Sequence, residues 1–374
     1  MKIEILKENL KLGLDITERS VGKNLSLPIL NNVLISTEDN FLSMVSTNLE
    51  TTIKFWVLAK IIKPGKVVVP IKIFSSFVAS LPNEKIILEE RGNNLHVECK
   101  NFKTQIQGQS PDDFPIIPQF NSTGKIEVEV QRLCSGLSQV IDIPVDSQAR
   151  PEISGVYFNF LKNNLKVVAT DSFRLAEKSI STQSPVQKEF SLIMPKKPAR
   201  DTAGILDGKE GNLSMNFSEN QVMFDFPMKE TKHPQVQIIS RLIEGEYPNY
   251  QEIIPTKFKT SVVLKKDEFL SQIKTASLFS GRINEVKVIV NPEKSEVEIF
   301  SKSPEVGENK SIIQAKSKGE LVEVSFNYKY LADGVQNIKS SEIIFEVSKE
   351  DGPCLLKPVG DESYIYVVMP IKAL

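Results

Sequence analysis

Few residues in this chain of 374 are of the types and at the spacings that covalent chemistry needs. The only two histidines, His96 and His233, lie far apart in the sequence, so they predict neither a metal site nor a catalytic triad. The neighbouring carboxylates of Asp112 and Asp113 fall in a linker and are expected to be solvated. The sequence contains no G-x-x-x-x-G-K-[ST] phosphate loop and no G-x-G-x-x-G motif. We therefore predict no catalytic residue, no metal and no cofactor.

A polar turn at residues 171–172 is the best candidate for a binding site. Asp171-Ser172 has short side chains that can cap a bent backbone, and we interpret Asp171 as a turn-stabilising residue and not as a catalytic acid. Thr170, Arg174 and Leu175 would be presented where this turn meets the surface. Such a place can hold an apolar pocket with a basic rim.

Strands are expected on both sides of this turn. Residues 156–160 alternate apolar and polar side chains, which is the pattern of a half-buried strand. Asn163-Asn164 predicts a first turn, residues 165–169 a second strand, and residues 173–175 the start of a third. The site residues would thus sit on a small antiparallel sheet.

The composition is that of an ordinary globular protein. The length allows two or three domains with cores of their own. No apolar run approaches the ~20 residues that a membrane helix needs, and the start from Lys2 onward does not resemble a signal peptide. The cysteines Cys99, Cys134 and Cys354 are scattered and expected to be reduced thiols. We expect a cytoplasmic protein without a membrane partner.

The chain contains internal repeats. The segments PILNNV from Pro28 and PEISGV from Pro151 match at an offset of 123 residues. The same offset places Ser46-Thr47-Asn48 on Ala169-Thr170-Asp171. Both copies predict a strand that ends in a short polar turn.

A second element recurs three times, as a strand, a junction residue and an amphipathic helix. The junction residue is Pro70, Pro195 or Asn327. Proline is tolerated at the first helical position and asparagine is a good N-cap, so we expect these roles here. Six helices are predicted, at 7–20, 70–81, 131–143, 195–207, 265–282 and 327–339.

Each repeat is predicted to be an α+β unit with two helices over a strand-rich sheet. Proline-rich linkers, FPIIP before Gln119 and YPNYQEIIP before Thr256, separate the repeats. The predicted domains are 1–122, 123–255 and 256–374.

These segments together resemble one known family. SLPILNNVLI, ARP…SGV…NNLKVVATDSFRLAEK and the ending YVVMPIKAL, with DFP and EYPNY before the later domains, closely resemble the bacterial DNA polymerase III beta subunit, the sliding clamp. The resemblance covers the whole chain. It implies three repeated clamp domains, each with two helices over antiparallel sheets, and a head-to-tail homodimeric ring of six domains around duplex DNA. It also implies a non-catalytic processivity factor, whose partners are the replicative polymerase catalytic subunit, a clamp loader complex and other proteins with clamp-binding motifs.

The charge pattern agrees with an inward-facing helical lining. A net charge of −1 requires any basic surface to be segregated, and the six predicted helices carry +5 while the remainder carries −6. Lys72, Lys197 and Lys329 share one position near a helix start, where the helix dipole disfavours a cation. A phosphate lining would explain this recurrence, although ordinary solvated lysines remain the alternative. With the channel loops that the resemblance implies, the candidate DNA contacts are Lys23, Asn24, Lys72, Ser147, Gln148, Arg150, Lys196, Lys197 and Lys329.

The resemblance also implies a groove that binds partner peptides between the central and C-terminal domains. Its lining in this chain would be Ile153, Thr170, Phe173, Arg174, Leu175, Pro248, Ile253, Val367, Val368, Met369, Pro370 and Ile371. For Val367 a place in the last core strand is an equally good interpretation. Glu252 stands where many relatives have a basic residue, and Ala373 is an extra residue near the end, so peptide preference is expected to differ.

The resemblance also implies which surfaces of two chains meet to close the ring. They map to the strand around Lys103, Gln105 and Ile106 and to Leu278-Phe279. Two other classes of protein are alternatives to the clamp. A peptide-binding scaffold that never surrounds DNA is disfavoured by the charge split, and a hydrolase at Asp171–Arg174 by the lack of a nucleophile–base pair.

Overall fold

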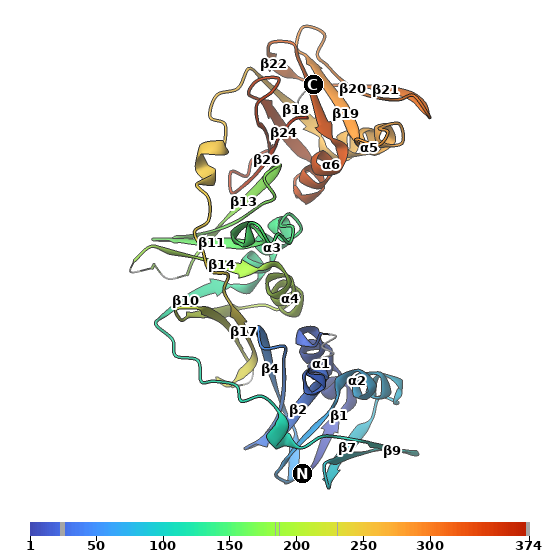
Figure 1. The fold of residues 1–374 in the computed structure, drawn as a ribbon, viewed down its shortest axis with the longest axis vertical. Coiled ribbons are helices and arrows are strands. Elements are labelled where there is room, and N and C mark those ends of the chain that lie inside the picture. Colours follow the sequence, from blue (N-terminus) through green and yellow to red (C-terminus); the bar gives the residue numbers. More distant parts are fainter. Residues whose placement is uncertain (23–26, 184, 187, 230, 372–374) are drawn as a thin grey trace. The chain divides into compact units, whose positions relative to one another are not determined.

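The computed structural model describes residues 1–22, 27–183, 185–186, 188–229 and 231–371 (Figure 1). These described residues form six α-helices: α1 (Lys7–Thr17), α2 (Ile71–Ser80), α3 (Val130–Val140), α4 (Lys196–Leu206), α5 (Lys266–Ser277) and α6 (Tyr328–Asn337). All six predicted helices are confirmed. The largest difference is at the end of α5, which stops at Ser277 because the chain then turns, with Gly281 at a φ of 61°. No helix among the described residues is long and apolar enough to cross a membrane.

The chain divides into two compact units. Unit 1 takes the described residues within 1–134, 182–184 and 197–242, and unit 2 takes those within 135–181, 185–196 and 243–374. Short 3₁₀ helices lie in both units, at η1 (Glu18–Ser20), η2 (Pro28–Asn31), η3 (Pro111–Asp113), η4 (Pro151–Ile153) and η5 (Tyr250–Ile253).

Unit 1 has two antiparallel sheets among its described residues. The first follows the order β5 (Lys60–Lys63), β1 (Lys2–Leu6), β7 (Lys85–Arg91), β8 (Asn94–Cys99) and β9 (Phe102–Ile106). The second follows the order β10 (Gly124–Glu129), β15 (Asn212–Phe217), β16 (Gln221–Pro227), β17 (Pro234–Arg241), β4 (Thr51–Leu58), β3 (Phe41–Thr47), β2 (Asn32–Glu38) and β6 (Lys66–Pro70).

Unit 2 likewise has two antiparallel sheets in its described part. The larger follows the order β14 (Phe190–Pro195), β11 (Gly155–Leu161), β12 (Asn164–Thr170), β13 (Arg174–Ser181), β26 (Tyr364–Val368), β25 (Cys354–Pro358), β24 (Glu342–Val347), β18 (Thr260–Lys265) and β22 (Ser317–Gly319). The smaller follows the order β21 (Gly307–Gln314), β20 (Glu296–Ser303), β19 (Glu285–Asn291) and β23 (Val322–Asn327).

The strand orders show the threefold repeat directly. The pattern β6-β2-β3-β4 recurs as β14-β11-β12-β13 and as β23-β19-β20-β21. The pattern β1-β7-β8-β9 recurs as β10-β15-β16-β17 and as β18-β24-β25-β26. With two helices each, the chain consists of three repeated domains of mixed helix and sheet. The boundaries at 122 and 255 stay a prediction, because the larger sheets run from one repeat into the next.

Two strand pairings join successive repeats. β17 pairs with β4 in unit 1, and β26 pairs with β13 in unit 2. In the first repeat, β9 is the strand equivalent to β17 and β26, and in the third repeat, β21 is the strand equivalent to β4 and β13. Each of them forms the outer edge of its sheet among the described residues.

The helices cover one face of each sheet, and close contacts show which face this is. A Cβ on Gly13 of α1 would lie 2.0 Å from Met44 Cε and 2.7 Å from Phe55 Cδ1. A Cβ on Gly334 of α6 would lie 2.4 Å from Tyr366 Cδ1. Because side chains alternate along a strand, the neighbours of Met44, Phe55 and Tyr366 point to the face without helices.

The strand-to-helix junctions differ from the prediction in one respect. Pro70 and Pro195 end β6 and β14, so each stands one residue before the first helical position and not at it. Asn327 is confirmed as the N-cap of α6, where its Oδ1 accepts the backbone N–H of Lys329 at 3.0 Å.

Candidate functional site

The predicted turn at Asp171-Ser172 is confirmed, and two side chains hold it. Asp171 Oδ1 accepts the backbone N–H groups of Phe173 and Arg174, both at 3.0 Å. Thr170 Oγ1 donates to the carbonyl of Arg174 at 2.8 Å and accepts the N–H of Ser172 at 3.2 Å. Ser172 has the left-handed φ of 76° that such a turn requires. The Asp171 carboxylate therefore accepts hydrogen bonds from the backbone of the turn, as expected of a turn-stabilising residue.

Arg174 is fixed more firmly than a rim residue would be. Its Nε donates to Asp171 Oδ2 at 2.9 Å, its Nη1 donates to Asp333 of α6, and its guanidinium carbon lies 4.7 Å from the ring centroid of Tyr330. Burial disfavours the charge, but Tyr366 and the two carboxylates outweigh burial and raise the pKa of Arg174 above its ordinary value. The side chain is only 9 % exposed, so the basic rim expected here is instead an internal link between the turn and α6.

Strand pairing brings residues from distant parts of the sequence to this turn. In the pairing of β13 with β26, Arg174 lies opposite Val368 and Leu175 opposite Val367. The backbone N–H of Met369 donates to the carbonyl of Phe173 at 2.8 Å. The structure thus brings the pocket residues around 173–175 next to those at 367–369, which the sequence analysis had assigned to one site.

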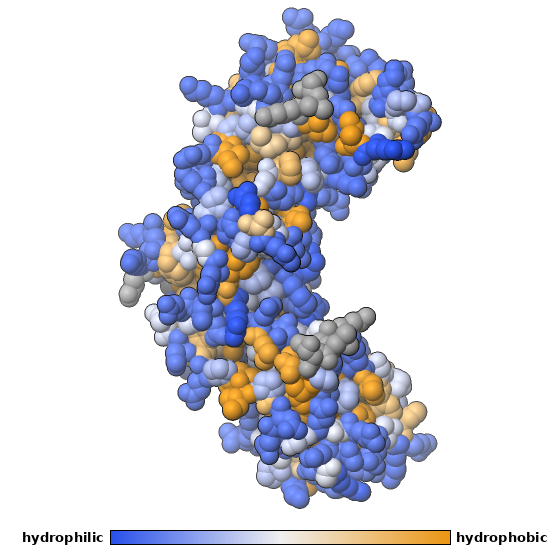
Figure 2. Space-filling model, viewed as in Figure 1, coloured by the Kyte–Doolittle hydropathy of each residue, from blue (hydrophilic) through white to orange (hydrophobic). Residues whose placement is uncertain are grey.

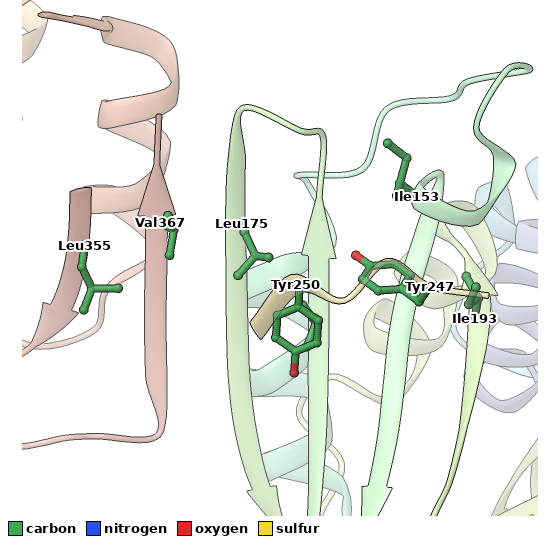
Figure 3. Packing of buried hydrophobic residues seen from close by; sticks show 8 residues of the cluster. Ile153, Leu175, Ile193, Tyr247, Tyr250, Leu355 and Val367 are labelled. Carbon is green, nitrogen blue, oxygen red and sulfur yellow. The ribbon is translucent and has the colours of Figure 1, made fainter. Parts of the chain in front are cut away.

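An apolar cluster lies beneath this junction in unit 2. Figure 3 shows Leu175 and Val367 on neighbouring strands, with Tyr247 and Tyr250 carried over the sheet by the segment that precedes β18. The cluster consists of Ile153, Val168, Leu175, Ile193, Tyr247, Tyr250, Leu355 and Val367. We call its surface, together with the turn at 170–174 and residues 367–371, the central cradle.

Tyrosines that the sequence reasoning missed form the floor of the central cradle. Tyr157 stacks on Tyr247 with ring centroids 4.5 Å apart. Tyr250 Oη donates to Glu177 Oε2 at 2.6 Å, and Lys166 Nζ pairs with Glu177 Oε1 at 2.8 Å. Burial, with the hydrogen bond to Glu177, raises the pKa of Tyr250 well above its ordinary value. The motif EYPNY was the available signal for these rings.

Exposure separates the predicted pocket residues into two groups. Six are buried: Ile153, Thr170, Arg174, Leu175, Val367 and Val368. Phe173 is 58 % exposed and Ile253 is also exposed, while Pro248, Met369, Pro370 and Ile371 are half-buried. A ligand would therefore meet this second group. Phe173 stacks near Tyr330 of α6, at 6.1 Å between ring centroids, so α6 contributes to the cradle as well.

Arg150, predicted to contact DNA, lies against the same turn. Its Nη1 donates to Ser172 Oγ at 3.2 Å and its Nε to Glu152 at 3.3 Å. Its backbone N–H donates to Ser147 Oγ at 3.1 Å, and Gln148 next to it is exposed. This places an exposed guanidinium beside the central cradle, where the sequence prediction had put Arg174.

The recurrent lysines occupy equivalent positions, as predicted. Lys72, Lys197 and Lys329 are the second residues of α2, α4 and α6, and all three are exposed. Lys197 Nζ donates to the carbonyl of Arg19 and to Asp201, both at 2.7 Å. Lys196 is tied to the backbone instead, since its Nζ donates to the carbonyl of Pro144. Lys23 and Asn24 lie outside the described residues.

The segregation of charge persists with the helix bounds of the structure. The six helices of the described chain together carry +4, which leaves −5 for the rest of the sequence. The basic excess therefore sits on the helices.

The predicted closing surfaces are only partly accessible. Lys103 and Gln105 of β9 are exposed, but Ile106 is buried in its own unit and offers no free surface. The exposed apolar side chain of this strand is Phe102, at 47 %, which the sequence reasoning missed. In unit 2, Leu278 is 71 % exposed and Phe279 is half-buried.

His233 packs against an aromatic ring, and the three cysteines are buried. His233 stacks on Phe41 with centroids 4.1 Å apart, and no group of three or more metal-ligating side chains occurs among the described residues. The thiols of Cys99, Cys134 and Cys354 are free and buried.

The fold and the cradle together define a repeat-built binding protein, and comparison with known proteins identifies its family. Models of the N-terminal, central and C-terminal domains of the DNA polymerase III beta subunit match residues 1–118, 128–249 and 251–372. The chain belongs to this family. It is a DNA polymerase sliding clamp, a processivity factor without catalytic activity of its own, and it binds DNA and polymerase partners.

Relatives match over the full length of the chain. The beta sliding clamp of Bacillus subtilis strain 168 is 27% identical, and that of Synechococcus elongatus is 24% identical, with 100% of this chain and 99% or more of each relative covered. Crystal structures of the sliding clamp from Bacillus subtilis and of the beta subunit from Thermotoga maritima superpose with TM-scores of 0.93 and 0.92, each at 26% identity and full coverage of both chains. A Pseudomonas aeruginosa clamp bound to griselimycin, 22% identical, shares the fold with a TM-score of 0.93.

Proposed function

We propose that two copies of the chain close head to tail into a ring of six domains around duplex DNA. The observation that carries this proposal is the strand order. Within the chain, β17 pairs with β4 and β26 with β13, and β9 and β21 are the corresponding edges left open among the described residues. Pairing β9 of one copy with β21 of the other would repeat the same junction and cover both edges.

The side chains at these two edges suit such a junction. Phe102 offers an apolar contact on β9, flanked by the exposed Lys103 and Gln105. Leu278, after α5 in unit 2, is 71 % exposed and offers a second apolar contact. Unlike surfaces meet in a head-to-tail contact, so the two sets need not resemble each other.

The helix-covered faces would line the hole of the ring. Their net positive charge and the equivalent lysines Lys72, Lys197 and Lys329 favour contact with phosphates. Such contacts carry no sequence information, which a sliding protein requires. Ser147, Gln148 and Lys196 are further candidates from the sequence, whereas Arg150 lies beside the central cradle and is better placed to meet a partner.

Partners would dock as short peptides in the central cradle. Phe173, Ile253, Met369, Pro370 and Ile371 offer accessible apolar surface over a rigid floor of tyrosines. Methionine adapts to varied ligands, which suits a site shared by several partners. The partners implied are the replicative polymerase catalytic subunit, an ATP-driven clamp loader and other proteins with clamp-binding motifs, in the cytoplasm.

The mechanism is topological. A closed ring cannot leave DNA sideways, so a weakly bound polymerase stays at a high effective concentration at its template. The test is retention of the chain on DNA after loading by the clamp loader. Retention on nicked circular DNA, with rapid loss after the circle is cut once, is the expected result. Equal retention on circular and linear DNA would instead mean a scaffold that never surrounds the duplex.

A further inference from the structure

The turn of the central cradle has a second copy in unit 1. Asn48 Oδ1 accepts the backbone N–H groups of Glu50 and Thr51 at 3.0 and 2.7 Å. Thr47 Oγ1 donates to the carbonyl of Thr51 at 3.2 Å and accepts the N–H of Leu49 at 3.0 Å. Leu49 has a φ of 74°, against 76° for Ser172 in the central turn. These four hydrogen bonds match those made by Thr170 Oγ1 and Asp171 Oδ1 in the central turn.

The strand that closes the central cradle is also duplicated. β17 pairs with β4 so that Ser240 lies opposite Thr51 and Ile239 opposite Thr52. The backbone N–H of Arg241 donates to the carbonyl of Glu50 at 2.9 Å, as that of Met369 does to Phe173. Arg241 therefore takes the place that Met369 has in the central cradle.

A matching apolar base lies beneath this second turn. Val45, Val68 and Phe114 form a buried cluster, with Ile29, Leu34 and Ile117 packed against it. Val45 is the counterpart of Val168 at the repeat offset, and the linker residues Phe114 and Ile117 take the place of the two linker tyrosines of the central cradle. We call the turn at 47–51, this base and residues 239–242 the first cradle.

The side chains on the open face differ in charge between the two cradles. The face of β3 and β4 that α1 does not cover carries Val45, Thr52 and Lys54. Lys54 stands where the central cradle has Glu177, and Thr52 stands where it has Leu175. The first cradle has therefore exchanged Glu177, Leu175 and Met369 for Lys54, Thr52 and Arg241. It has also exchanged the exposed Phe173 for the exposed Glu50, which lies opposite Arg241, so its cations are Lys54 and Arg241 while the turn itself carries an acid.

Both cations are available to a ligand. Within the described part of the chain, neither Lys54 nor Arg241 uses its side chain in an ion pair or hydrogen bond. Burial lowers the pKa of Lys54, and the charge of Glu38 partly offsets this. Lys54 lies opposite Gln237, four residues before Arg241, so the two cations are about 13 Å apart along the sheet.

Apolar side chains next to the cations complete the surface. Leu49 at the tip of the turn is exposed, and Ile116 in the connecting segment is 93 % exposed. On the face drawn in Figure 2, hydrophobic side chains form separate patches within a mainly hydrophilic surface. An isolated exposed isoleucine needs no partner, but here it precedes the linker residue Ile117 that packs into the cradle.

We propose that the first cradle is a second docking site, which binds an extended acidic peptide segment of a partner protein. Two carboxylates of the peptide, four residues apart, meet Lys54 and Arg241, and an aliphatic side chain between or beside them contacts Leu49. The central cradle, with its apolar face, does not compete for this peptide. One chain thereby offers two sites with different chemistry, and two kinds of partner can occupy it together.

The test is selection of a random seven-residue peptide library on the immobilised chain, with counter-selection on the Lys54→Gln/Arg241→Gln double variant. Enriched peptides should carry two carboxylates four residues apart and at least one aliphatic residue. Each cation removed should weaken their binding about tenfold, since a hydrogen bond to a charged group contributes about 1.5–3 kcal/mol. Leu49→Asn, which suits the left-handed backbone, should weaken it as well.

Matched controls separate this site from the rest of the molecule. Lys66→Gln/Lys125→Gln removes the same charge from exposed positions of unit 1 and should leave peptide binding unchanged. Phe173→Ala, in the central cradle, should also leave it unchanged. The proposal is overturned if no peptide distinguishes the chain from the double variant, or if Phe173→Ala abolishes binding. It is equally overturned if the double variant loses affinity for duplex DNA while peptide binding persists, because the face would then contact nucleic acid.

Discussion

Asn48 and Asp171, 123 residues apart, perform the same structural task in two copies of one turn. Each Oδ1 accepts the backbone N–H groups two and three residues ahead, at distances between 2.7 and 3.0 Å. Only Asp171 has a second use, because its other oxygen accepts from Arg174 at 2.9 Å. The amide in one copy and the carboxylate in the other show that the turn itself needs an acceptor and not a charge.

This comparison predicts how Asp171 tolerates substitution. Asp171→Asn should keep the turn and lose only the attraction to Arg174, whereas Asp171→Ala leaves two backbone donors without their acceptor. We expect Asp171→Ala to lower the free energy of unfolding by about 1–3 kcal/mol more than Asp171→Asn, measured by urea denaturation. Asn48→Asp in the other copy should be nearly neutral. Equal losses for the two Asp171 variants would refute this account of the turn.

Phe173 is the accessible aromatic side chain of the central cradle, so its removal should act on binding and not on folding. Phe173→Ala should weaken binding of the polymerase catalytic subunit by about tenfold or more in surface plasmon resonance, since anchor residues dominate such interfaces. The melting temperature should change little, because the side chain is 58 % exposed. Val306→Ala, at a similarly exposed site in unit 2, is the control. Unchanged affinity would remove Phe173 from the site.

Closure of the ring predicts a dimer that single charges can break. Light scattering across a dilution series should give twice the chain mass for the unaltered protein. Phe102→Asp or Leu278→Asp should shift the mass toward the monomer, because a buried unpaired carboxylate is costly. Ile116→Asp places the same charge on an apolar side chain that is 93 % exposed and lies outside the proposed seam, so it should leave the dimer intact. A trimer would exclude a ring of six domains.

The equivalent lysines predict a dependence on salt. Replacing Lys72, Lys197 and Lys329 by alanine should weaken binding to DNA of any sequence. The slope of log K against log salt should become shallower by about 0.9 for each phosphate that a lysine no longer neutralises. Lys349→Ala, in the exposed loop between β24 and β25 of unit 2, should leave the slope unchanged. A change that depends on DNA sequence would contradict a phosphate lining.

The thiols predict a chemical signature of the folded state. Burial raises the pKa of Cys134 to about 11 and that of Cys354 to about 12. At about pH 8 the reactive thiolate is therefore a very small fraction of either residue. A thiol reagent such as Ellman's should react slowly with the native chain and rapidly with all three cysteines in urea. Fast reaction of the native chain would mean that one of them is accessible.

Much of the fold followed from the sequence because the local signals are strong. The helix after Asn327 and the turn at Asp171 depend on neighbours in the chain, and both are as predicted. The junctions between repeats could not be found in this way. The pairing of Leu175 with Val367 joins residues almost two hundred positions apart, and only the resemblance to the clamp family indicated it.

The same limit explains the site residues that were misplaced. Arg174 was expected at an exposed rim because a basic residue after a turn is usually solvated. Asp333 and Tyr330 enclose it from a helix more than 150 positions later, which no local pattern reveals. Arg150 was assigned to DNA from the resemblance to the clamp family; its guanidinium lies against the turn, and its contact with DNA stays a prediction. Ile106 was expected to be accessible on its strand, but alternation along β9 turns it inward.

The open edges of β9 and β21 have a consequence for how a closed ring would part. The junctions of β17 with β4 and of β26 with β13 are tethered by the chain itself, which keeps their strands at a local concentration of about millimolar or more. A junction between two copies has no such tether and must rely on the concentration of free protein. The β17–β4, β26–β13 and β9–β21 junctions would thus differ in stability even with equal contacts, because only the first two join strands of the same chain. In the proposed ring the untethered seam would be the one that opens, and a loader would need to recognise only this kind of junction.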